Sequence, residues 1–434
     1  MSRSLLFLVL GAAAPLAAQR ADSNLATFDA ATRIVERTHF DTTFNGVNWT
    51  ALRDSLRPHA MGVSRDSVRG LIRGMLGRLG QSHFAIFPSD MAEASGEDAL
   101  RESGTVGMDL GLVEGRIMVQ EVEAGGAASA AGIRPGWIVT AVENVKMDSM
   151  VERLRTRPAH YSLTMRAIRA ASTQLLGPVE SAVTVHLLDD KDRPISKRLV
   201  RREDTGPQVK FGYFPTFFAR FHAHQLQESG ARAGVIWFSN WLVPLVRQVD
   251  SAIDAYRGLD GMVLDLRRNS GGMAAMVGGV AGHFTSRPDT LGINQTRTSR
   301  LVFVANPRKA MSDGRSVTPY AGPVAILLDE LSGSASEIFA AGMRDIKRVR
   351  VFGATSIGGV LPASWDRLPN GDVLYHAIGE FITPSGERLE GVGVVPDEPV
   401  TVTRADLLAG RDPVITAAMR WIAGEKGRRT GATP

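Results

Sequence analysis

A strand-like run gives way to a helical pattern at three closely spaced serines, Ser332, Ser334 and Ser336. Val324–Leu328 is a continuous apolar run with the length of a strand that is buried on both faces. A turn with Gly333 follows, and helical spacing begins at Ser336. Ser334 is therefore expected beside a helix N-terminus, where free N–H groups and the helix dipole can stabilise an oxyanion. The alternative is that these serines only cap the helix.

The pair Ser82-His83 is a second candidate for chemistry. It follows the amphipathic segment Ser64–Leu79, for which Ser64 is a suitable N-cap and Gly80 a suitable end. An imidazole changes its charge near neutral pH and is the commonest general base for a hydroxyl. Without further context, a single histidine at a helix exit is more often structural.

A glycine-rich turn follows another buried strand. Met262–Leu266 is apolar and runs into a turn that contains Gly271 and Gly272, before the apolar helix predicted for Met273–Phe284. In open α/β sheets, ligands bind at the carboxyl ends of the strands, and this turn and the serine turn both lie at such ends. The alternative is a tight structural turn.

The composition limits the kinds of chemistry that are available. The chain has 434 residues, of which 44% are hydrophobic and 22% are charged, as in a globular protein of two or three domains. It has no cysteine, which excludes disulfides, thiolate catalysis and cysteine-ligated metals. The net charge of +5 is spread along the chain, so we expect no nucleic-acid partner. Met1–Gln19 has a basic start and a short apolar run, which predicts a cleaved secretory signal and no stable membrane anchor.

Three short strand-like stretches with glycine turns follow the N-terminal region, at Gly104–Leu112, Arg116–Val122 and Ala131–Val139. The Ala-Gly-Ile-Arg-Pro-Gly-Trp-Ile block and a helix near Met147–Leu154 complete a pattern that resembles a PDZ domain. PDZ modules bind a chain-terminal carboxylate through backbone N–H groups and add the peptide as a strand. The resemblance implies that the substrate-binding loop comprises Thr105, Val106, Gly107 and Met108.

The chain departs from the PDZ pattern in two places. Trp137 stands where the family usually has an aspartate, and Pro158–Pro178 adds a segment, expected to be helical, before the last strand Val183–Leu188. Asp189–Gln208 reads as a basic, turn-rich connector to the following domain. Peptide binding is thus a weaker expectation than the PDZ-like fold.

Three separate blocks together resemble the C-terminal processing (tail-specific) serine proteases. They are Asp265-Leu-Arg-Arg-Asn-Ser-Gly-Gly272, Ser334-Ala-Ser-Glu337, and Thr383-Pro-Ser-Gly386 with Glu390-Gly-Val-Gly-Val-Val-Pro-Asp397. A PDZ-like domain ahead of the first block has the family's order. The resemblance implies that Ser334 is the nucleophile. It also implies an oxyanion hole formed by backbone N–H groups of Gly271 or Gly272 and of Ala335.

One position departs from many members of this family, which activate the serine with a lysine after the next strand. Gly359 stands at that position. The tricorn-protease branch instead uses a Ser–His–Ser–Glu arrangement, which Ser82, His83 and Glu390 resemble. By that resemblance His83 is the general base for Ser334, Ser82 orients the imidazole, and Glu390 polarises Ser82. We therefore expect the pH dependence of an imidazole, whose unperturbed pKa is about 6.5.

We predict an α/β (α+β) protease core with a mixed sheet and flanking helices, a small N-terminal helical region and an inserted β-rich PDZ-like domain. The expected divisions are a signal peptide at 1–19, the helical region at 20–90, the PDZ-like domain at 100–203, the core at 204–425 and a flexible tail at 426–434.

The sequence thus predicts a periplasmic or secreted serine endopeptidase that cleaves peptides or unfolded proteins near their C-termini. Side chains and backbone amides suffice for this chemistry, so we expect no cofactor and no metal. Two alternatives remain open: a non-catalytic ligand- or peptide-binding protein with the protease fold, and an esterase or amidase for small substrates. The oligomeric state and the natural substrate do not follow from the sequence.

Overall fold

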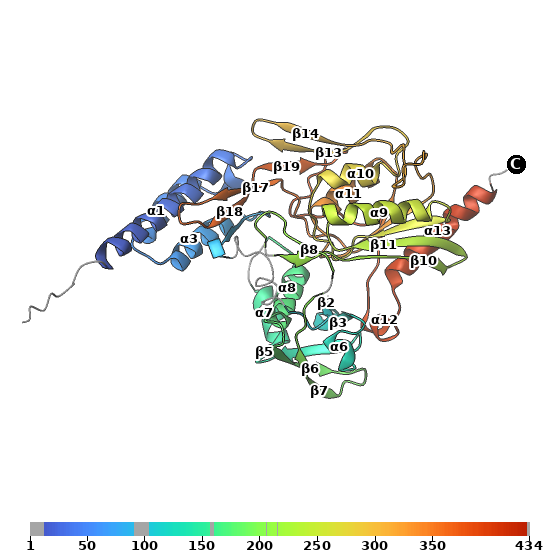
Figure 1. The fold of residues 1–434 in the computed structure, drawn as a ribbon, viewed down its shortest axis with the longest axis horizontal. Helices are drawn as coiled ribbons and strands as arrows, with labels where there is room; N and C mark the ends of the chain where they lie inside the picture. Colours follow the sequence, from blue (N-terminus) through green and yellow to red (C-terminus); the bar gives the residue numbers. More distant parts are fainter. Residues whose placement is uncertain (1–12, 91–103, 157–159, 205, 215, 432–434) are drawn as a thin grey trace, which may run out of the picture.

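The computed structural model describes residues 13–90, 104–156, 160–204, 206–214 and 216–431. Figure 1 shows an N-terminal group of helices, a β-rich domain and a larger core of strands and helices. This is the mixed α/β architecture expected from the sequence. Residues 1–12 of the predicted signal peptide and residues 91–103, which include the start of the predicted PDZ-like domain, lie outside the described residues. Residues 13–19 belong to the first helix.

The N-terminal region is helical, as predicted. Ser64 caps helix α3 by accepting a hydrogen bond from the N–H of Ser67, and Gly80 follows the helix with a φ of 61°. The apolar faces pack into one small core that also contains Leu374 of a distant strand. The elements are α1 (Ala13–Thr38), η1 (Phe44–Gly46), α2 (Trp49–Leu56), η2 (Arg57–Ala60), α3 (Arg65–Arg78) and β1 (Ala85–Phe87).

The PDZ-like domain has one sheet with the strand order β2-β3-β4-β6-β7. Trp137 lies in its hydrophobic core, so the departure from the PDZ pattern is accommodated by burial. The expected extra helix is α8, whereas the predicted connector 189–208 contains a further strand, β7, that pairs with β6. The elements are β2 (Met108–Val113), β3 (Arg116–Val122), α6 (Ala127–Ala130), β4 (Ile138–Val142), β5 (Val145–Lys146), α7 (Met147–Arg155), α8 (Leu163–Leu175), β6 (Ala182–Leu188) and β7 (Pro194–Val200).

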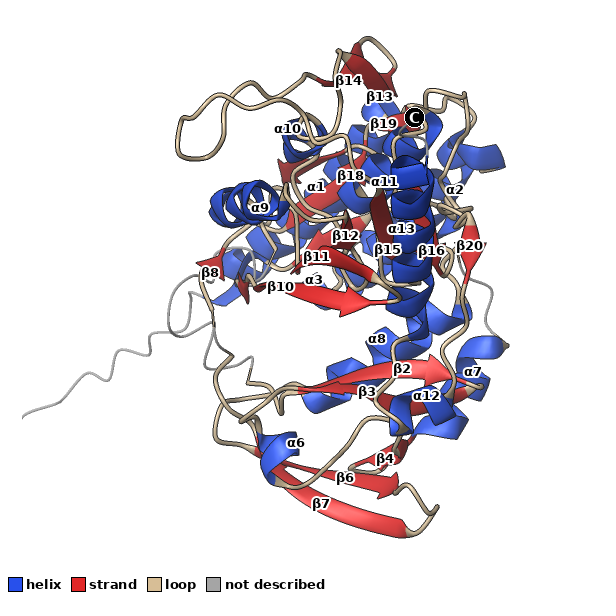
Figure 2. Cartoon of the chain, turned by 90° about the vertical axis from the view of Figure 1, so that its right-hand side faces the viewer, coloured by secondary structure: helices blue, strands red, loops and turns tan. Residues whose placement is uncertain are grey.

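The core sheet has the order β10-β11-β12-β15-β16-β20, and all of its pairs are parallel except β10 with β11. Alternate residues of its central strands face two separate hydrophobic clusters, one formed with α9, α10 and α11 and one with α13 (Figure 2). The elements are β10 (Phe221–Glu228), β11 (Ala231–Phe238), α9 (Val243–Tyr256), β12 (Gly261–Asp265), α10 (Ala275–Ala281), β15 (Val324–Leu328), α11 (Ala335–Asp345), β16 (Arg350–Gly353), β20 (Glu398–Pro399) and α13 (Pro413–Gly431).

Smaller sheets and one short helix complete the core. Sheet β14-β13-β19 packs against the helices, and sheet β1-β18-β17 joins the core to the N-terminal region. Helix α13 continues to Gly431, through most of the segment predicted to be a flexible tail. The elements are β8 (Gln208–Val209), β9 (Phe217–Phe218), β13 (Asp289–Thr296), β14 (Arg300–Ala305), β17 (Ala363–Arg367), β18 (Val373–Ala377), β19 (Gly379–Ile382) and α12 (Arg404–Leu408).

Helix α12 and the turn after β12 both tie the PDZ-like domain to the core. Leu407 of α12 packs into a small cluster with apolar residues of β2, β3 and β4, and Arg404 of the same helix forms an ion pair of 2.7 Å with Asp192. Arg268, in the turn after β12, donates to the carbonyl of Leu110 in β2 at 3.1 Å and pairs with Asp109 at 3.2 Å. The turn that contains the oxyanion-hole candidates is therefore linked directly to the edge strand of the PDZ-like sheet.

Candidate active site

Ser334 occupies a strained turn between β15 and α11. Its φ of 52° and ψ of −114° lie outside the regions that L-residues normally adopt, and its N–H donates to the Glu337 carboxylate at 2.8 Å. The turn requires a close neighbour without a side chain, because a Cβ on Gly271 would lie 2.6 Å from the Cβ of Ser334. Strain of this kind concentrates at functional sites. Ser334 is half-buried and follows the sheet directly at the helix N-terminus, as predicted.

The other two serines of the motif have structural roles. Ser332 is fully buried and donates to the carbonyl of Leu266 at 2.8 Å. Ser336 is fully buried too; it donates to the carbonyl of Asn269 at 3.0 Å and accepts from the indole N–H of Trp241 at 2.9 Å. Their hydroxyls hold the turn that precedes α10 against the Ser334 turn. Ser334 is thus the best candidate nucleophile of the three.

The expected oxyanion hole narrows to two N–H groups. The N–H of Gly271 donates to the side-chain oxygen of Asn269 at 3.0 Å and is therefore already used. Among the hydrogen bonds of the described residues, the N–H groups of Gly272 and Ala335 have no partner. Gly271, the residue before Gly272, lies directly against the Ser334 turn, since a Cβ at position 271 would lie 2.6 Å from the Cβ of Ser334 and 3.1 Å from the nitrogen of Ala335. Gly272 and Ala335 remain the candidate donors to an oxyanion.

The structure brings Ser82, His83 and Glu390 together in one hydrogen-bonded chain. The Ser82 Oγ lies 2.6 Å from Nδ1 of His83 and 2.9 Å from Oε2 of Glu390. Oε1 of Glu390 accepts from the N–H of Ser82 at 2.6 Å, and Oε2 also accepts from the N–H of Val360 at 3.1 Å. Ser82 and Glu390 thus lie in contact although they are far apart in the sequence.

The protons of this chain can be assigned from what each group can do. An ionised Glu390 carboxylate only accepts, so the Ser82 hydroxyl donates to it and must accept from His83. Nδ1 of His83 then carries the proton, and Nε2 has a free lone pair. That tautomer is the one required of a general base.

Burial and neighbouring charges decide the protonation of both ends of this chain. Burial is the largest effect on His83 and lowers its pKa to about 4. The Glu390 carboxylate partly offsets burial by raising this pKa, and the neighbouring His160 lowers it further. Burial raises the pKa of Glu390, but His160, whose Nε2 is 3.0 Å away, and the hydrogen bonds from Ser82 outweigh burial and leave this pKa below its ordinary value. Near neutral pH the pair is therefore a neutral imidazole and a carboxylate.

His83 and Ser334 are not joined by a hydrogen bond among the described contacts. Hydrogen bonds between catalytic groups are often long before substrate binds and shorten in the complex. The structure therefore brings Ser82, His83 and Glu390 together, whereas Ser334 has no hydrogen bond to them among the described contacts.

Part of the chain matches a known protein family. Residues 233–400 match the model of Peptidase family S41. Carboxyl-terminal-processing peptidase 2, chloroplastic, of Arabidopsis thaliana is 25% identical over 85% of this chain and 67% of its own length. The chain is a serine peptidase, a hydrolase, and its residues 233–400 are similar to family S41.

Two solved structures share the fold of this chain. The photosystem II D1 C-terminal processing protease covers 87% of this chain and 93% of its own, with a TM-score of 0.58 and 21% identity. The tricorn protease covers 94% of this chain and 37% of its own, with a TM-score of 0.51 and 15% identity. Because both are this distant, the choice between a lysine and a histidine base must be argued from the residues of the chain.

By the sequence resemblance, Gly359 stands where many C-terminal processing proteases have the lysine that activates the serine. A Cβ at Gly359 would lie 3.3 Å from Cγ2 of Ile357, 3.5 Å from the Cβ of Ser82 and 3.6 Å from a ring carbon of Tyr161. Position 359 thus lies beside Ser82, and its surroundings by themselves do not distinguish a lysine base from a histidine base.

Two further residues of this candidate site were not identified from the sequence. Glu337 is fully buried and accepts from the hydroxyl of Ser356 and from the N–H groups of Ser334, Gly358 and Gly359, at 2.6 to 3.1 Å. Burial raises the pKa of Glu337 to about 7, although the four hydrogen bonds favour the ionised form and lower this pKa in part. Glu337 was visible as the last residue of the Ser334-Ala-Ser-Glu337 block.

The second such residue is His160, which precedes α8 of the PDZ-like domain. Its Nε2 lies 3.0 Å from Oε1 of Glu390. No local signal identifies this residue, because it lies within the extra segment 158–178, which has no counterpart in the PDZ pattern.

The predicted carboxylate-binding loop, Thr105–Met108, is partly committed to the PDZ-like domain itself. The N–H of Thr105 donates to the carbonyl of Arg202 at 2.8 Å, and that of Gly107 donates to the Thr105 hydroxyl at 3.1 Å. Binding of a peptide terminus at this loop stays a prediction.

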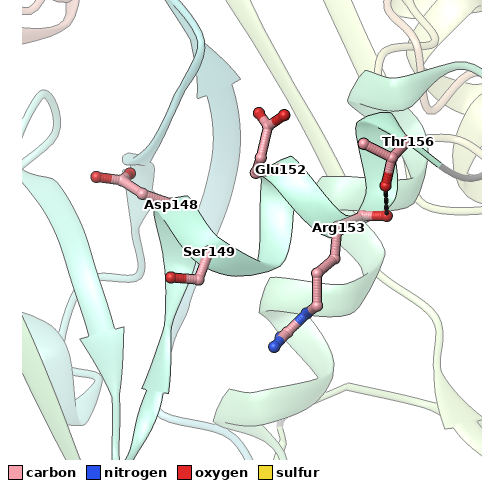
Figure 3. A pocket seen from close by; sticks show the side chains of 5 residues that line it. All are labelled: Asp148, Ser149, Glu152, Arg153 and Thr156. Carbon is pink, nitrogen blue, oxygen red and sulfur yellow. Dashed lines mark hydrogen bonds between the residues drawn. The ribbon is translucent and has the colours of Figure 1, made fainter.

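The remaining surface features carry no chemistry that we can assign. Among the described residues, no cluster of three or more histidines and acidic residues is arranged to hold a metal, and no helix is long and apolar enough to cross a membrane. A surface pocket of about 490 Å³ lies along α7 and is shown in Figure 3. It is lined by Asp148, Ser149, Glu152, Arg153 and Thr156, none of which belongs to the site around Ser334.

Proposed function

We propose that this chain is a serine endopeptidase that uses Ser334 as the nucleophile and His83 as the general base. The observation that carries the proposal is the bridging Ser82 hydroxyl, 2.6 Å from Nδ1 of His83 and 2.9 Å from the Glu390 carboxylate. This bridge favours the tautomer of His83 whose Nε2 can accept a proton. It supports the tricorn-like arrangement over a lysine base.

In the proposed reaction, Nε2 of His83 removes the proton of Ser334 as Oγ attacks the carbonyl carbon of the scissile peptide bond. The resulting oxyanion accepts hydrogen bonds from the N–H groups of Gly272 and Ala335. His83 then protonates the leaving amine, and a water molecule hydrolyses the acyl-enzyme by the same steps. The imidazole and the Ser334 hydroxyl must approach each other when substrate binds.

We further propose that the substrates are peptides or unfolded proteins that are cleaved near their C-termini. The similarity to a carboxyl-terminal-processing peptidase and the PDZ-like domain beside the site support this substrate class. Export to the periplasm or the medium is a proposal that rests on the pattern of Met1–Gln19, and the N-terminal sequence of the mature chain tests it.

Labelling with a fluorophosphonate, followed by mapping of the adduct by mass spectrometry, tests the nucleophile. We expect one adduct, on Ser334, and loss of both the adduct and peptide hydrolysis in Ser334→Ala. An adduct on a different serine would refute the assignment. A folded chain that takes no label would favour the alternative of a non-catalytic binding protein. Hydrolysis of esters but not of peptides would favour the alternative of an esterase.

A further inference from the structure

His160 reaches the catalytic carboxylate from the PDZ-like domain. It lies just before α8 (Figure 1), its side chain is 13% exposed, and its Nε2 is 3.0 Å from Oε1 of Glu390. The ring also lies within reach of the backbone carbonyls of Gly80 and Gly358, and a Cβ on Gly391 would be 3.4 Å from its Cε1. Oxygen acceptors from the N-terminal region and from the core therefore meet around one imidazole of the inserted domain.

We propose that His160 is a positioning residue of this active site, which keeps Glu390 ionised and thereby holds His83 in its reactive tautomer. The inference deepens the proposed function and rests on it. It also makes the inserted domain a direct contributor to the catalytic chain.

The Glu390 carboxylate has four polar contacts among the described residues. Three come from Ser82 and Val360, and His160 supplies the only histidine or cationic partner among the described contacts of this carboxylate. Burial by itself favours the protonated acid, so loss of His160 lets Glu390 take up a proton at a higher pH. A proton on Oε2 would donate to Ser82 and turn the Ser82 hydroxyl toward Nδ1 of His83. A proton on Oε1 would leave Oε2 a weaker acceptor for Ser82.

Either protonation state weakens the base. When Ser82 donates to Nδ1, the proton of the neutral imidazole moves to Nε2, which can no longer accept from Ser334. The tyrosines next to His160, Glu390 and His83 are Tyr161, whose ring packs edge-on against that of His160 at 4.9 Å, and Tyr375, whose ring lies 5.8 Å from that of His83. The charges of Glu390, Arg169 and Glu337 act on Tyr161 in turn. Burial lowers the pKa of His160, but Glu390 outweighs burial and raises it, so the imidazolium is favoured beside the carboxylate.

Removal of His160 has two effects on the acidic side of the pH profile, and both have the same sign. Glu390 protonates at a higher pH because it loses its partner. His83 also protonates at a higher pH because a positive neighbour is lost. The acidic limb of kcat/KM must therefore move upward, whereas a contact that only stabilises the domains would lower activity about equally at every pH.

The test uses the full chain with one peptide substrate between pH 4 and pH 9, and compares wild type, His160→Ala and His160→Gln. His186→Ala is the matched control, because His186 lies in the same domain and bonds to Ser196, away from the site. We expect the acidic limb of kcat/KM in His160→Ala to move upward by about one pH unit, from about pH 4 to about pH 5, so that kcat/KM falls about fivefold more at pH 4 than at pH 8. His160→Gln keeps a donor without the charge and should recover kcat at pH 8 but not the acidic limb. His186→Ala should follow wild type.

Nitrogen-15 NMR of histidine-labelled protein gives a readout that does not depend on turnover. We expect Nδ1 of His83 to carry the proton in wild type at pH 6, and a larger share of the Nε2-protonated or doubly protonated forms in both His160 variants. Parallel pH profiles with an unchanged His83 signal would overturn the inference, and so would an equal shift in His186→Ala.

These outcomes are distinct from a failure of the proposed function. If His83→Ala keeps its activity, the proposed base is wrong, whatever His160 does. If His83→Ala is inactive and the His160 variants keep the wild-type pH profile and NMR signal, the inference about His160 alone is wrong. If His160→Ala does not fold, His160→Gln and its NMR spectrum still decide.

Discussion

Replacement of Glu390 by glutamine should reverse the direction of the Ser82 hydroxyl. The carboxylate accepts on both oxygens, but a glutamine must place an NH₂ group at one of them. At the Oε1 position this group would face the N–H of Ser82, now 2.6 Å away, and at the Oε2 position it would face the N–H of Val360, now 3.1 Å away. The longer contact is the less costly one to lose, so the NH₂ group should take the Oε2 position.

In that position the glutamine donates to Ser82, which must then donate to Nδ1 of His83. The proton of His83 moves to Nε2, and the base is blocked. Recovery of the reactive tautomer requires the amide to turn and leave the Ser82 N–H unsatisfied, which costs about 1–3 kcal/mol. Since about 1.4 kcal/mol corresponds to a factor of ten in rate, we expect kcat to fall about 5- to 150-fold.

The assay is the single-turnover rate with one peptide at pH 7.5, combined with urea unfolding. Glu380→Gln is the matched control, because Glu380 pairs only with Arg388 among the described contacts and lies outside the site. The unpaired Val360 N–H should also lower the free energy of unfolding of Glu390→Gln by about 1–3 kcal/mol. A folded Glu390→Gln with wild-type kcat, or with Nδ1 of His83 still protonated by NMR, would refute the reasoning.

Further predictions concern the base, the buried glutamate and the substrate terminus. His83→Ala should lose on the order of 10³-fold in kcat, more than Ser82→Ala or Glu390→Gln, and near-wild-type activity would exclude this base. Because burial lowers the pKa of His83 to about 4, the acidic limb of kcat/KM should lie well below pH 6.5; a limb at or above pH 6.5 would contradict the buried environment of His83. The folded state then binds fewer protons than the unfolded chain between about pH 4 and pH 6.5, so this histidine's contribution to stability, followed by urea midpoints, should be lost as the pH falls through that range. Glu337→Gln should lower the free energy of unfolding by about 1–3 kcal/mol and should also lower kcat, because its NH₂ group would face a backbone N–H at either oxygen position. Unchanged values of both would show that the four hydrogen bonds to Glu337 are dispensable. Amidation of a substrate's C-terminus should raise KM more than it lowers kcat, and equal constants for both forms would remove terminal recognition.

Local patterns predicted the central elements well. Val324–Leu328 is a strand with the expected bounds, because a strand buried on both faces needs an unbroken apolar run. Helix α3 begins after Ser64 and ends before Gly80, as capping chemistry requires. The apolar helix predicted at Met273–Phe284 is shorter, Ala275–Ala281, because its ends are turns.

The missed strands are those that lack such a signal. Strand β10 carries His222, His224 and Gln225 and is the edge strand of its sheet, so only part of it is buried. Strand β7 alternates between exposed and half-buried residues at the far edge of the PDZ-like sheet. Their backbone hydrogen bonds to the neighbouring strand define them, and a pattern of side chains along the chain does not reveal such a partner.

For the site, the sequence by itself determined which residues are available for chemistry: a serine at a strand-to-helix turn, a Ser82-His83 pair after a helix, and a glycine in place of a lysine. The first two follow from residue types and short spacings, which are local properties of the chain, and the third follows from the family resemblance. Only the tertiary structure decided that Ser82 bridges His83 and Glu390, that the N–H of Gly271 is already used, and that His160 contacts the same carboxylate. Those facts depend on distances between segments that are remote in sequence, and such distances exist only once the sheets and the inserted domain have packed together.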